Sequence, residues 1–470
     1  MDNKFYITTP IYYVNDVPHI GHTVTTVVAD IIARYQKQLG KNVFFLTGTD
    51  EHGAKVAEAA QKDNCAPGEF CDRVSKSFET IWPKLDINFN YFIRTTNPKH
   101  KQIVSELLEK IYKNGDIYKA KYEGLYCTGC EKFITETEIK DGKCPYHPDK
   151  PLEKQSEENW FFKLAKYVPV LSEAIENPNH PNHYEIEPAG KKSEVLARLK
   201  SGINDISISR AEVSWGIPIP WDKSQTIYVW VDALINYFSA LKINNKEDFW
   251  PTDIHLIGKE ILWFHAVIWE ALLLSAGISL PKKIYAHGFY TIDGQKMSKS
   301  LGNVISPQQL LEKFGVDGTR YLLASSFPSV EDSDVGLDKF TTKYNADLAN
   351  GLGNLIARVA KLCETSGFEF KETKLEFDSS WKKHIESLHL NEALERTWEY
   401  VNENNKIINE NKWWELTGNH LQTALQSGVD SLRKIAYHLQ PFMPQTSQKI
   451  TDQFKGPKIK SAEALFPRLK

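Results

Sequence analysis

The sequence predicts an α/β protein in which a parallel sheet is split by an inserted domain and followed by a helical bundle. Three observations predict this class. A strand–helix–strand pattern opens the chain and returns in its middle part, which is typical of a parallel sheet. A cysteine-bearing segment without that rhythm separates the two occurrences, and the C-terminal part consists of amphipathic, strand-poor stretches.

The N-terminal half of the predicted sheet begins with the β-rich run KFYITT. From Thr23, apolar residues recur at three- and four-residue steps, which predicts a helix that Gly40 ends. Residues 43–53 (VFFLTGTDEHG) then indicate a buried strand that ends in polar groups. Ligands of parallel sheets bind beyond the carboxyl ends of the strands. The polar residues expected at that edge are His19, His22, Asp50 and His52.

The second half of the sheet repeats this order. Residues 253–260 (DIHLIGKE) predict a strand, followed by a helix that ends at Gly277. Residues 283–295 (KIYAHGFYTIDGQ) predict a strand pair joined near the turn formed by Asp293 and Gly294. We therefore expect the core in two pieces, 1–117 and 222–300, with an inserted domain at 118–221 between them.

Helices are expected to dominate the rest of the chain. In VISPQQLLEKFG, Ser306 is a predicted N-cap, Pro307 takes the first helical position and Gln309 completes a capping box. We assign residues 301–343 to a connecting region and 344–470 to a helical bundle.

Composition narrows the class of protein. A chain of 470 residues has room for two or three domains, and a formal net charge of −3 argues against non-specific coating of nucleic acid. Its apolar runs stay below the ~18 residues that span a bilayer. The N-terminus MDNKFYITTP lacks the order of a secretory signal. We expect a cytoplasmic protein that does not enter a membrane.

The inserted segment carries a candidate metal site. Its ligands are two pairs with metal-ligand spacing, Cys127 with Cys130 and Cys144 with His147. Three thiolates and one imidazole suit a tetrahedral Zn²⁺ ion, one per chain, and a closed set of four protein ligands indicates a structural role. The alternative is that these are incidental thiols in a loop.

The stretch around His19, Gly21 and His22 lies at the N-terminus of the first predicted helix, where free N–H groups and the helix dipole attract anions. Glycine allows a ligand to approach the backbone, and the imidazoles add hydrogen-bond donors to a phosphate. The alternative is that the histidines only cap or pack the helix.

A cationic loop, GQKMSKSLGN, follows the last strands of the same sheet. Lys296 and Lys299 in this loop are suited to neutralise the charge that develops on a phosphoryl group during its transfer. Alone, the run would be read as a solvated charged surface. Its place at the same edge of the sheet as the histidines favours the phosphate role.

The two motifs, His19-Ile20-Gly21-His22 and Lys296-Met297-Ser298-Lys299-Ser300, resemble the signatures of class I aminoacyl-tRNA synthetases in the expected order. The resemblance extends along nearly the whole chain and implies a Rossmann-type sheet split by a zinc-bearing connective insert. The short distance between the motifs leaves no room for the larger editing insert of the leucine, isoleucine and valine enzymes. The zinc motif and several local strings are similar to those of methionyl-tRNA synthetases.

This resemblance implies roles for individual residues. The predicted catalytic residues are His19, His22, Lys296 and Lys299, and the predicted ATP-binding residues are these four with Gly21, Gly258 and Glu260. Mg²⁺ is expected with ATP. Glu260 stands where the family commonly has Asp. The predicted methionine-binding residues are Ile11, Tyr13, Asp50, Trp230, Ala233, Leu234, Tyr237, Ile261 and His265. Without the resemblance, the apolar residues and His265 would be interpreted as core, and Asp50 as a polar strand end.

The resemblance also assigns tRNA contacts to the C-terminal part. Residues 301–343 are expected to contact the tRNA stem and 344–470 to bind the anticodon through Asn354, Arg358 and Trp414. The register of the tryptophan leaves Trp413 as an alternative, and packing against the bundle is the other interpretation for each of the pair.

The function expected from these features is ATP-dependent ligation of L-methionine to methionine tRNA through a methionyl-adenylate. Three alternatives are a class I synthetase for another amino acid, an inactive tRNA-binding paralogue, and a nucleotidyl transferase for a small metabolite. Nothing in the chain resembles the dimerising oligonucleotide-binding domain that some family members carry, so a monomer is expected.

Overall fold

A computed structural model describes residues 3–129, 132–134, 139, 141–297 and 302–470 of the chain. Its centre is a six-stranded sheet in the order β3-β2-β1-β12-β13-β7, and every neighbouring pair of strands is parallel. The strands are β1 (Lys4–Tyr13), β2 (Asn42–Asp50), β3 (Tyr91–Arg94), β7 (Glu185–Glu187), β12 (Ile254–Gly258) and β13 (Lys283–His287). The predicted fold class, a split parallel sheet with a helical C-terminal part, is confirmed.

Helices cover both faces of this sheet and bury two apolar layers. Successive side chains of a strand point to opposite faces, so Phe5 and Ile7 join one core cluster and Tyr6 joins the other. The first face packs against α1 (Ile20–Gln38) and α3 (Pro67–Lys84), and α2 (Ala54–Lys62) lies beside α3. The second face packs against α4 (Pro98–Lys113), α7 (Val229–Ile243) and α8 (Glu270–Ser275).

Two small antiparallel sheets are formed by strands in the inserted segment and directly after it. One has the order β5-β4-β6-β8 and the other β10-β11-β9. The strands are β4 (Ile117–Cys127), β5 (Lys132–Ile134), β6 (Leu152–Phe162), β8 (Ile206–Ser207), β9 (Ser209–Arg210), β10 (Pro218–Ile219) and β11 (Asp222–Ile227). The segment also contributes α5 (Val168–Glu176), α6 (Ala189–Lys200) and β7, which pairs with β13 at the edge of the central sheet.

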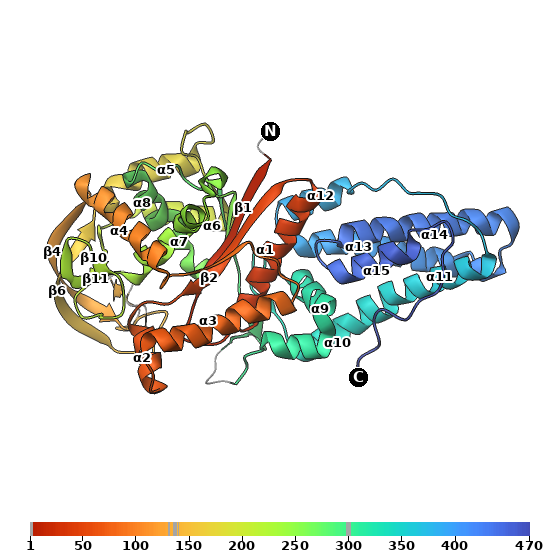
Figure 1. Ribbon diagram of the computed structural model, residues 1–470, viewed down its shortest axis with the longest axis horizontal. Helices are drawn as coiled ribbons and strands as arrows, with labels where there is room; N and C mark the ends of the chain where they lie inside the picture. Colours follow the sequence, from red (N-terminus) through yellow and green to blue (C-terminus); the bar gives the residue numbers. More distant parts are fainter. Residues whose placement is uncertain (1–2, 130–131, 135–138, 140, 298–301) are drawn as a thin grey trace.

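The C-terminal part is helical from α9 (Pro307–Ser325) onward. Its first helix starts as predicted, because Ser306 accepts from the Gln309 backbone at 3.2 Å and forms the capping box. The later helices are α10 (Leu337–Lys343), the π-helix η7 (Tyr344–Gly353), α11 (Asn354–Ser366), α12 (Ser379–Glu386), α13 (Leu390–Glu410), α14 (Gly418–Leu439) and α15 (Pro444–Phe454). Helices α11 to α15 extend from one end of the molecule, whereas β4 and β6 lie at the opposite end, with β1 and β2 between (Figure 1).

Several elements differ in detail from the expectation. Helix α1 begins at Ile20, earlier than the apolar periodicity indicates, because His19 caps it. The helix expected from residue 261 contains a π-helical stretch, η5 (Phe264–Trp269), before α8. The turn at Asp293 (φ 52°) and Gly294 (φ 71°) joins β14 (Tyr290–Ile292) to β15 (Gln295–Lys296), so the predicted strand pair is three strands.

Among the residues that the structure describes, no helix combines the length and the apolar character that crossing a membrane requires.

Candidate active site

A cavity of about 400 Å³ opens at the carboxyl edge of the central sheet. Four residues that line it are the last residues of their strands: Tyr13 of β1, Asp50 of β2, Gly258 of β12 and His287 of β13. Parallel strands direct their carboxyl ends to one edge, so residues distant in sequence converge there. The predicted location of the site is therefore also the location of this cavity.

One wall of the cavity is the N-terminus of α1. His19 is the N-cap, and its Nδ1 accepts from the Gly21 N–H at 3.1 Å. His22 Nδ1 accepts from the His19 N–H at 3.3 Å, and the two rings stack with centroids 3.8 Å apart. The capping alternative is thus correct as geometry, yet both histidines also line the cavity.

The protonation of these rings follows from their contacts. Because Nδ1 accepts a hydrogen bond in each ring, the ring proton sits on Nε2. Burial, with the positive charge of a protonated His19 as a second cause, lowers the pKa of His22 well below its ordinary value. His22 is therefore a neutral donor rather than a cation at neutral pH.

Gly21 is required where the backbone passes His19. A Cβ on Gly21 would lie 2.9 Å from His19 Cε1, closer than such contacts normally come. Only glycine therefore lets the imidazole fold back over the first turn of α1 while the N–H of Gly21 stays bonded to it.

The residues expected to bind methionine all line the same cavity. They are Ile11, Tyr13, Asp50, Trp230, Ala233, Leu234, Tyr237, Ile261 and His265. Their burial is mixed: Ala233, Leu234, Tyr237 and His265 are almost completely buried, and the apolar members also belong to, or pack against, the core. Core and cavity wall are thus the same residues here.

A hydrogen-bonded pair fixes the polar end of this wall. His265 Nδ1 lies 3.0 Å from the Ile261 carbonyl and therefore donates, which leaves Nε2 to accept from the Tyr237 hydroxyl at 2.7 Å. Burial lowers the pKa of His265 to about 4, so the ring is neutral. Trp230 stacks on Phe264 with ring centroids 4.0 Å apart. The π-helical stretch that carries Phe264 and His265 is a feature often found at functional sites.

Gly258 and Glu260 also line the cavity. A Cβ on Gly258 would lie 2.6 Å from Glu260 Oε2, so the longer glutamate folds its carboxylate over the glycine. The neighbouring Lys259 turns away to pair with Asp332 at 2.6 Å.

The cationic loop is only partly described. Lys299 lies outside the described residues, and so does the side chain of Lys296. The backbone of Lys296, in β15, pairs with Thr291 of β14. Met297 lines the cavity, which brings the start of this loop to the site.

Sequence reasoning missed several lining residues, among them Thr25, Lys55, His287 and Phe289. His287 Nε2 lies 2.9 Å from Thr25 Oγ1, and burial lowers the pKa of this imidazole to about 4. Its signal was available, because the string KIYAH places a histidine at the end of a predicted parallel strand. Lys55 gave no such signal; its Nζ lies 5.9 Å from the Tyr13 ring centroid and donates to the Gly129 carbonyl.

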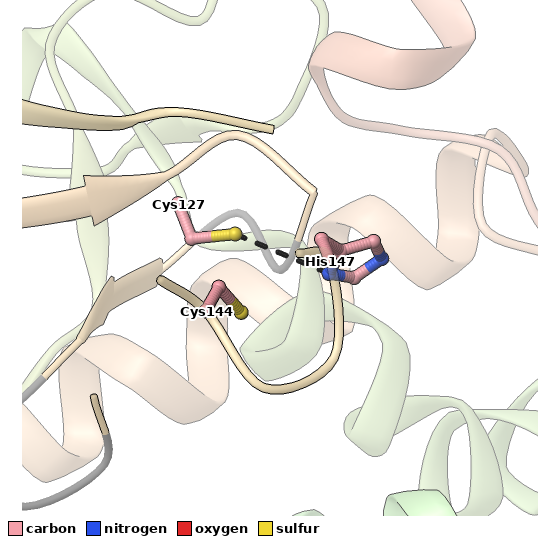
Figure 2. A group of neighbouring side chains, drawn as sticks. All are labelled: Cys127, Cys144 and His147. Carbon is pink, nitrogen blue, oxygen red and sulfur yellow. Dashed lines mark hydrogen bonds between the residues drawn. The ribbon is translucent and has the colours of Figure 1, made fainter. Parts of the chain in front are cut away.

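Three of the four predicted metal ligands converge in the inserted segment. Cys127, at the end of β4, and Cys144 and His147 each offer a ligand atom, and these atoms lie within 4.8 Å of one another. Figure 2 shows the Cys127 sulfur directed toward the His147 imidazole, with Cys144 beside them. Cys127 Sγ lies 4.0 Å from His147 Nδ1. Cys130 lies outside the described residues. Two buried thiols beside an imidazole are better explained as zinc ligands than as incidental thiols in a loop.

The predicted anticodon residues lie on the surface of the C-terminal helices. Asn354 begins α11, and Arg358 follows one turn later with its guanidinium 6.0 Å from the Trp414 ring centroid. The two candidate tryptophans differ: Trp414 is 55% exposed, whereas Trp413 is 3% exposed and contacts Gly428. An exposed ring beside a cation is suited to stacking on a base.

Known proteins resemble the chain over its whole length. The profile of the family described as tRNA synthetases class I (M) matches residues 5–151 and 147–360. A methionine–tRNA ligase of Thermotoga maritima is 44% identical over 95% of this chain and 74% of its own length. The chloroplastic/mitochondrial methionine–tRNA ligase of Arabidopsis thaliana is 42% identical over 96% of this chain and 77% of its own length. A structure of Mycobacterium tuberculosis methionyl-tRNA synthetase in complex with methionyl-adenylate superposes with a TM-score of 0.90 at 33% identity, covering 99% of this chain and 100% of that one.

Proposed function

The chain belongs to the methionyl-tRNA synthetases, a family of class I aminoacyl-tRNA synthetases, and we propose that it activates L-methionine at the cavity described above. Its reaction is the ATP-dependent ligation of methionine to tRNA. The observation that carries the placement is that all residues expected to bind methionine line one cavity with His19 and His22.

We propose that the methionine side chain occupies the apolar part of the cavity. Trp230, Leu234 and Ile261 give this part an aromatic and aliphatic lining that suits an unbranched thioether, and the neutral His265 adds no charge. Asp50 receives the ammonium group, because it is the carboxylate at the end of β2 that lines the same cavity. The methionine carboxylate then faces α1, where the phosphates of ATP bind.

We propose that ATP binds across α1 and β12. The N-terminus of α1, with the Nε2 donors of His19 and His22, binds the phosphates, and Gly258 and Glu260 approach the ribose. The carboxylate of methionine attacks the α-phosphorus, and pyrophosphate leaves with the electron pair of the cleaved P–O bond. Lys296 and Lys299 neutralise the charge that develops on the phosphates, and Mg²⁺ accompanies ATP.

Catalysis in this scheme rests on position and electrostatics, because the attacking carboxylate needs no activation by a base. The ribose hydroxyl of the tRNA terminus then attacks the methionyl carbonyl and releases AMP. The sequence-based alternative of an inactive paralogue has no support among the described residues, which retain both motif histidines at the cavity.

We propose that Cys127, Cys130, Cys144 and His147 hold one structural Zn²⁺ ion. Bound zinc would cross-link the last residue of β4, Cys127, to the loop that carries Cys144 and His147. Lys55 donates to the carbonyl of Gly129, within this knuckle, so the knuckle also contacts α2 beside the active site.

We further propose that the domain boundaries lie at 117, 221, 300 and 343. In this division 301–343 contacts the tRNA stem, and Asn354, Arg358 and Trp414 bind the anticodon. A monomer in the cytoplasm stays a prediction, and analytical ultracentrifugation tests its first part.

Amino-acid-dependent ATP–pyrophosphate exchange tests the proposal directly. We expect exchange with methionine and only background exchange with leucine, isoleucine, valine and cysteine. Asp50→Asn should abolish the methionine signal, while Asp205→Asn in the insert, at a residue that does not line the cavity, is the matched control. Equal exchange with another amino acid would overturn the assignment of the pocket.

A further inference from the structure

A second cluster of metal-ligand type lies in the C-terminal helices, far along the chain from the knuckle. It consists of His384 near the end of α12, His389 in the turn, and Glu392 in the first turn of α13. Each residue offers one ligand atom, and the three atoms lie within 4.8 Å of one another. Neither the active site nor the tRNA-binding residues described above include them.

The three ligand atoms already face a common point. Glu392 Oε2 lies 2.7 Å from His384 Nδ1 and 3.4 Å from His389 Nδ1. A tetrahedral ion with bonds of about 2.1 Å holds its ligand atoms about 3.4 Å apart. Of the three separations in the cluster, the one between Glu392 and His389 already equals this value. A small opening of the His384–Glu392 pair supplies the second, and the two imidazole nitrogens lie within 4.8 Å of each other.

The backbone of the turn holds the ligands in place. The His389 N–H donates to the His384 carbonyl at 2.9 Å, and the Leu388 N–H donates to Ile385 at 3.1 Å. Leu388 has a left-handed φ of 57° and is 1% exposed, so the turn is anchored in the core. The other ring nitrogen of His384 lies 3.2 Å from Ser380 Oγ, a contact of the kind that orients metal-binding imidazoles.

A simple salt bridge accounts less well for the arrangement, because two imidazoles share a single carboxylate oxygen. The side chains are 28%, 37% and 44% exposed for His384, His389 and Glu392, so an ion and a water molecule both have access. Two nitrogen ligands and one carboxylate oxygen suit a borderline divalent cation.

We propose that His384, His389 and Glu392 form a second site for a divalent cation of the zinc class, with water as the fourth ligand. The bound ion clips α12 to the start of α13. The clip lies at the seam with the catalytic core, because Glu386 of α12 accepts from the Tyr35 hydroxyl of α1 at 2.9 Å. It is distinct from the thiolate knuckle in donor chemistry and in position along the chain.

Cobalt titration of the full chain tests this site. The protein is used as purified, after its zinc content is measured, and Co²⁺ is added while visible absorption is recorded. We expect one equivalent to bind and to give d–d bands without a thiolate charge-transfer band, because no sulfur is in the set. Zn²⁺ added afterwards should compete for the same equivalent.

Two variants and one control complete the test. Glu392→Gln and His384→Phe should each weaken binding by more than about 10-fold, whereas His420→Ala, which removes an exposed imidazole on α14, should bind as the wild type does. Thermal midpoints recorded without added metal confirm that Glu392→Gln is folded. Absence of the sulfur-free equivalent in the wild-type protein, or unchanged binding in both variants, would overturn the proposal.

Discussion

His19 caps α1, and we propose that it also binds phosphate; one substitution should separate these two roles. Asparagine is among the best N-cap residues, and its side-chain oxygen can accept from the Gly21 N–H as His19 Nδ1 does at 3.1 Å. His19→Asn therefore keeps the cap and removes the imidazole from the cavity. His19→Ala removes both.

The expected magnitudes differ enough to decide between the roles. Loss of an N-cap lowers the free energy of unfolding by about 0.5–2 kcal/mol, so His19→Ala should be destabilised by that amount and His19→Asn should not. Loss of a donor to the developing charge of the transition state lowers the rate by about 10²–10³-fold, equivalent to about 2.7–4 kcal/mol. Both variants should lose this much activity.

Methionine-dependent ATP–pyrophosphate exchange at saturating substrates measures the rate, and urea unfolding measures stability. Asn97→Ser, which exchanges one good N-cap for another on α4, is the control and should leave both quantities near the wild-type values. If His19→Asn exchanged pyrophosphate at the wild-type rate, the histidine would be a cap alone, and its assignment to phosphate binding would be wrong.

Three further predictions follow from burial and metal chemistry. Burial lowers the pKa values of His265 and His287 to about 4, so the unfolded chain binds more protons than the folded one between pH 6.5 and 4. Each histidine should therefore lower the free energy of unfolding by up to about 3 kcal/mol as pH falls through this window. In urea unfolding, His287→Gln should show a shallower dependence of stability on pH. Cys144→Ser should reduce the zinc content measured by mass spectrometry and make the insert the first part of the protein to be cut by a protease, whereas Cys65→Ser, at a thiol outside the knuckle, should change neither. Trp414→Ala should raise the KM for tRNA by about 10-fold or more with unchanged thermal stability, whereas Trp413→Ala should destabilise the fold by about 3–5 kcal/mol; a reversed pattern would move the anticodon contact to Trp413.

Sequence reasoning reached the fold class because strand and helix periodicities are local. It also reached the cavity wall, since Ile11, Asp50 and His265 belong to strings that resemble a family. It could not place the π-helical stretch at residues 264–269, because the extra residue in that turn is a response to tertiary packing and leaves the apolar period nearly unchanged.

The other differences between the predicted and the observed structure also come from contacts that the local sequence pattern does not contain. The end of a predicted strand indicated that His287 lies at the edge of the sheet, but its contact with Thr25, 262 residues away in sequence, follows from no local pattern. Helix α1 begins before its predicted start because His19 caps it, and histidine is not among the residues by which helix starts are normally recognised. Lys299 and Cys130 lie outside the described residues, so their roles stay predictions.

The position of β7 limits how this protein can be dismantled or rebuilt. Glu185, Ile186 and Glu187 come from the middle of the insert, yet they pair with Lys283, Ile284 and Tyr285 of β13. Cutting out residues 118–221 as a cassette would strip β13 of its neighbour and leave a row of unpaired backbone groups, the kind of edge that seeds association between chains. An exchangeable unit must therefore be smaller than the insert. It is the antiparallel sheet built on β4 and β6, with β7 left in place.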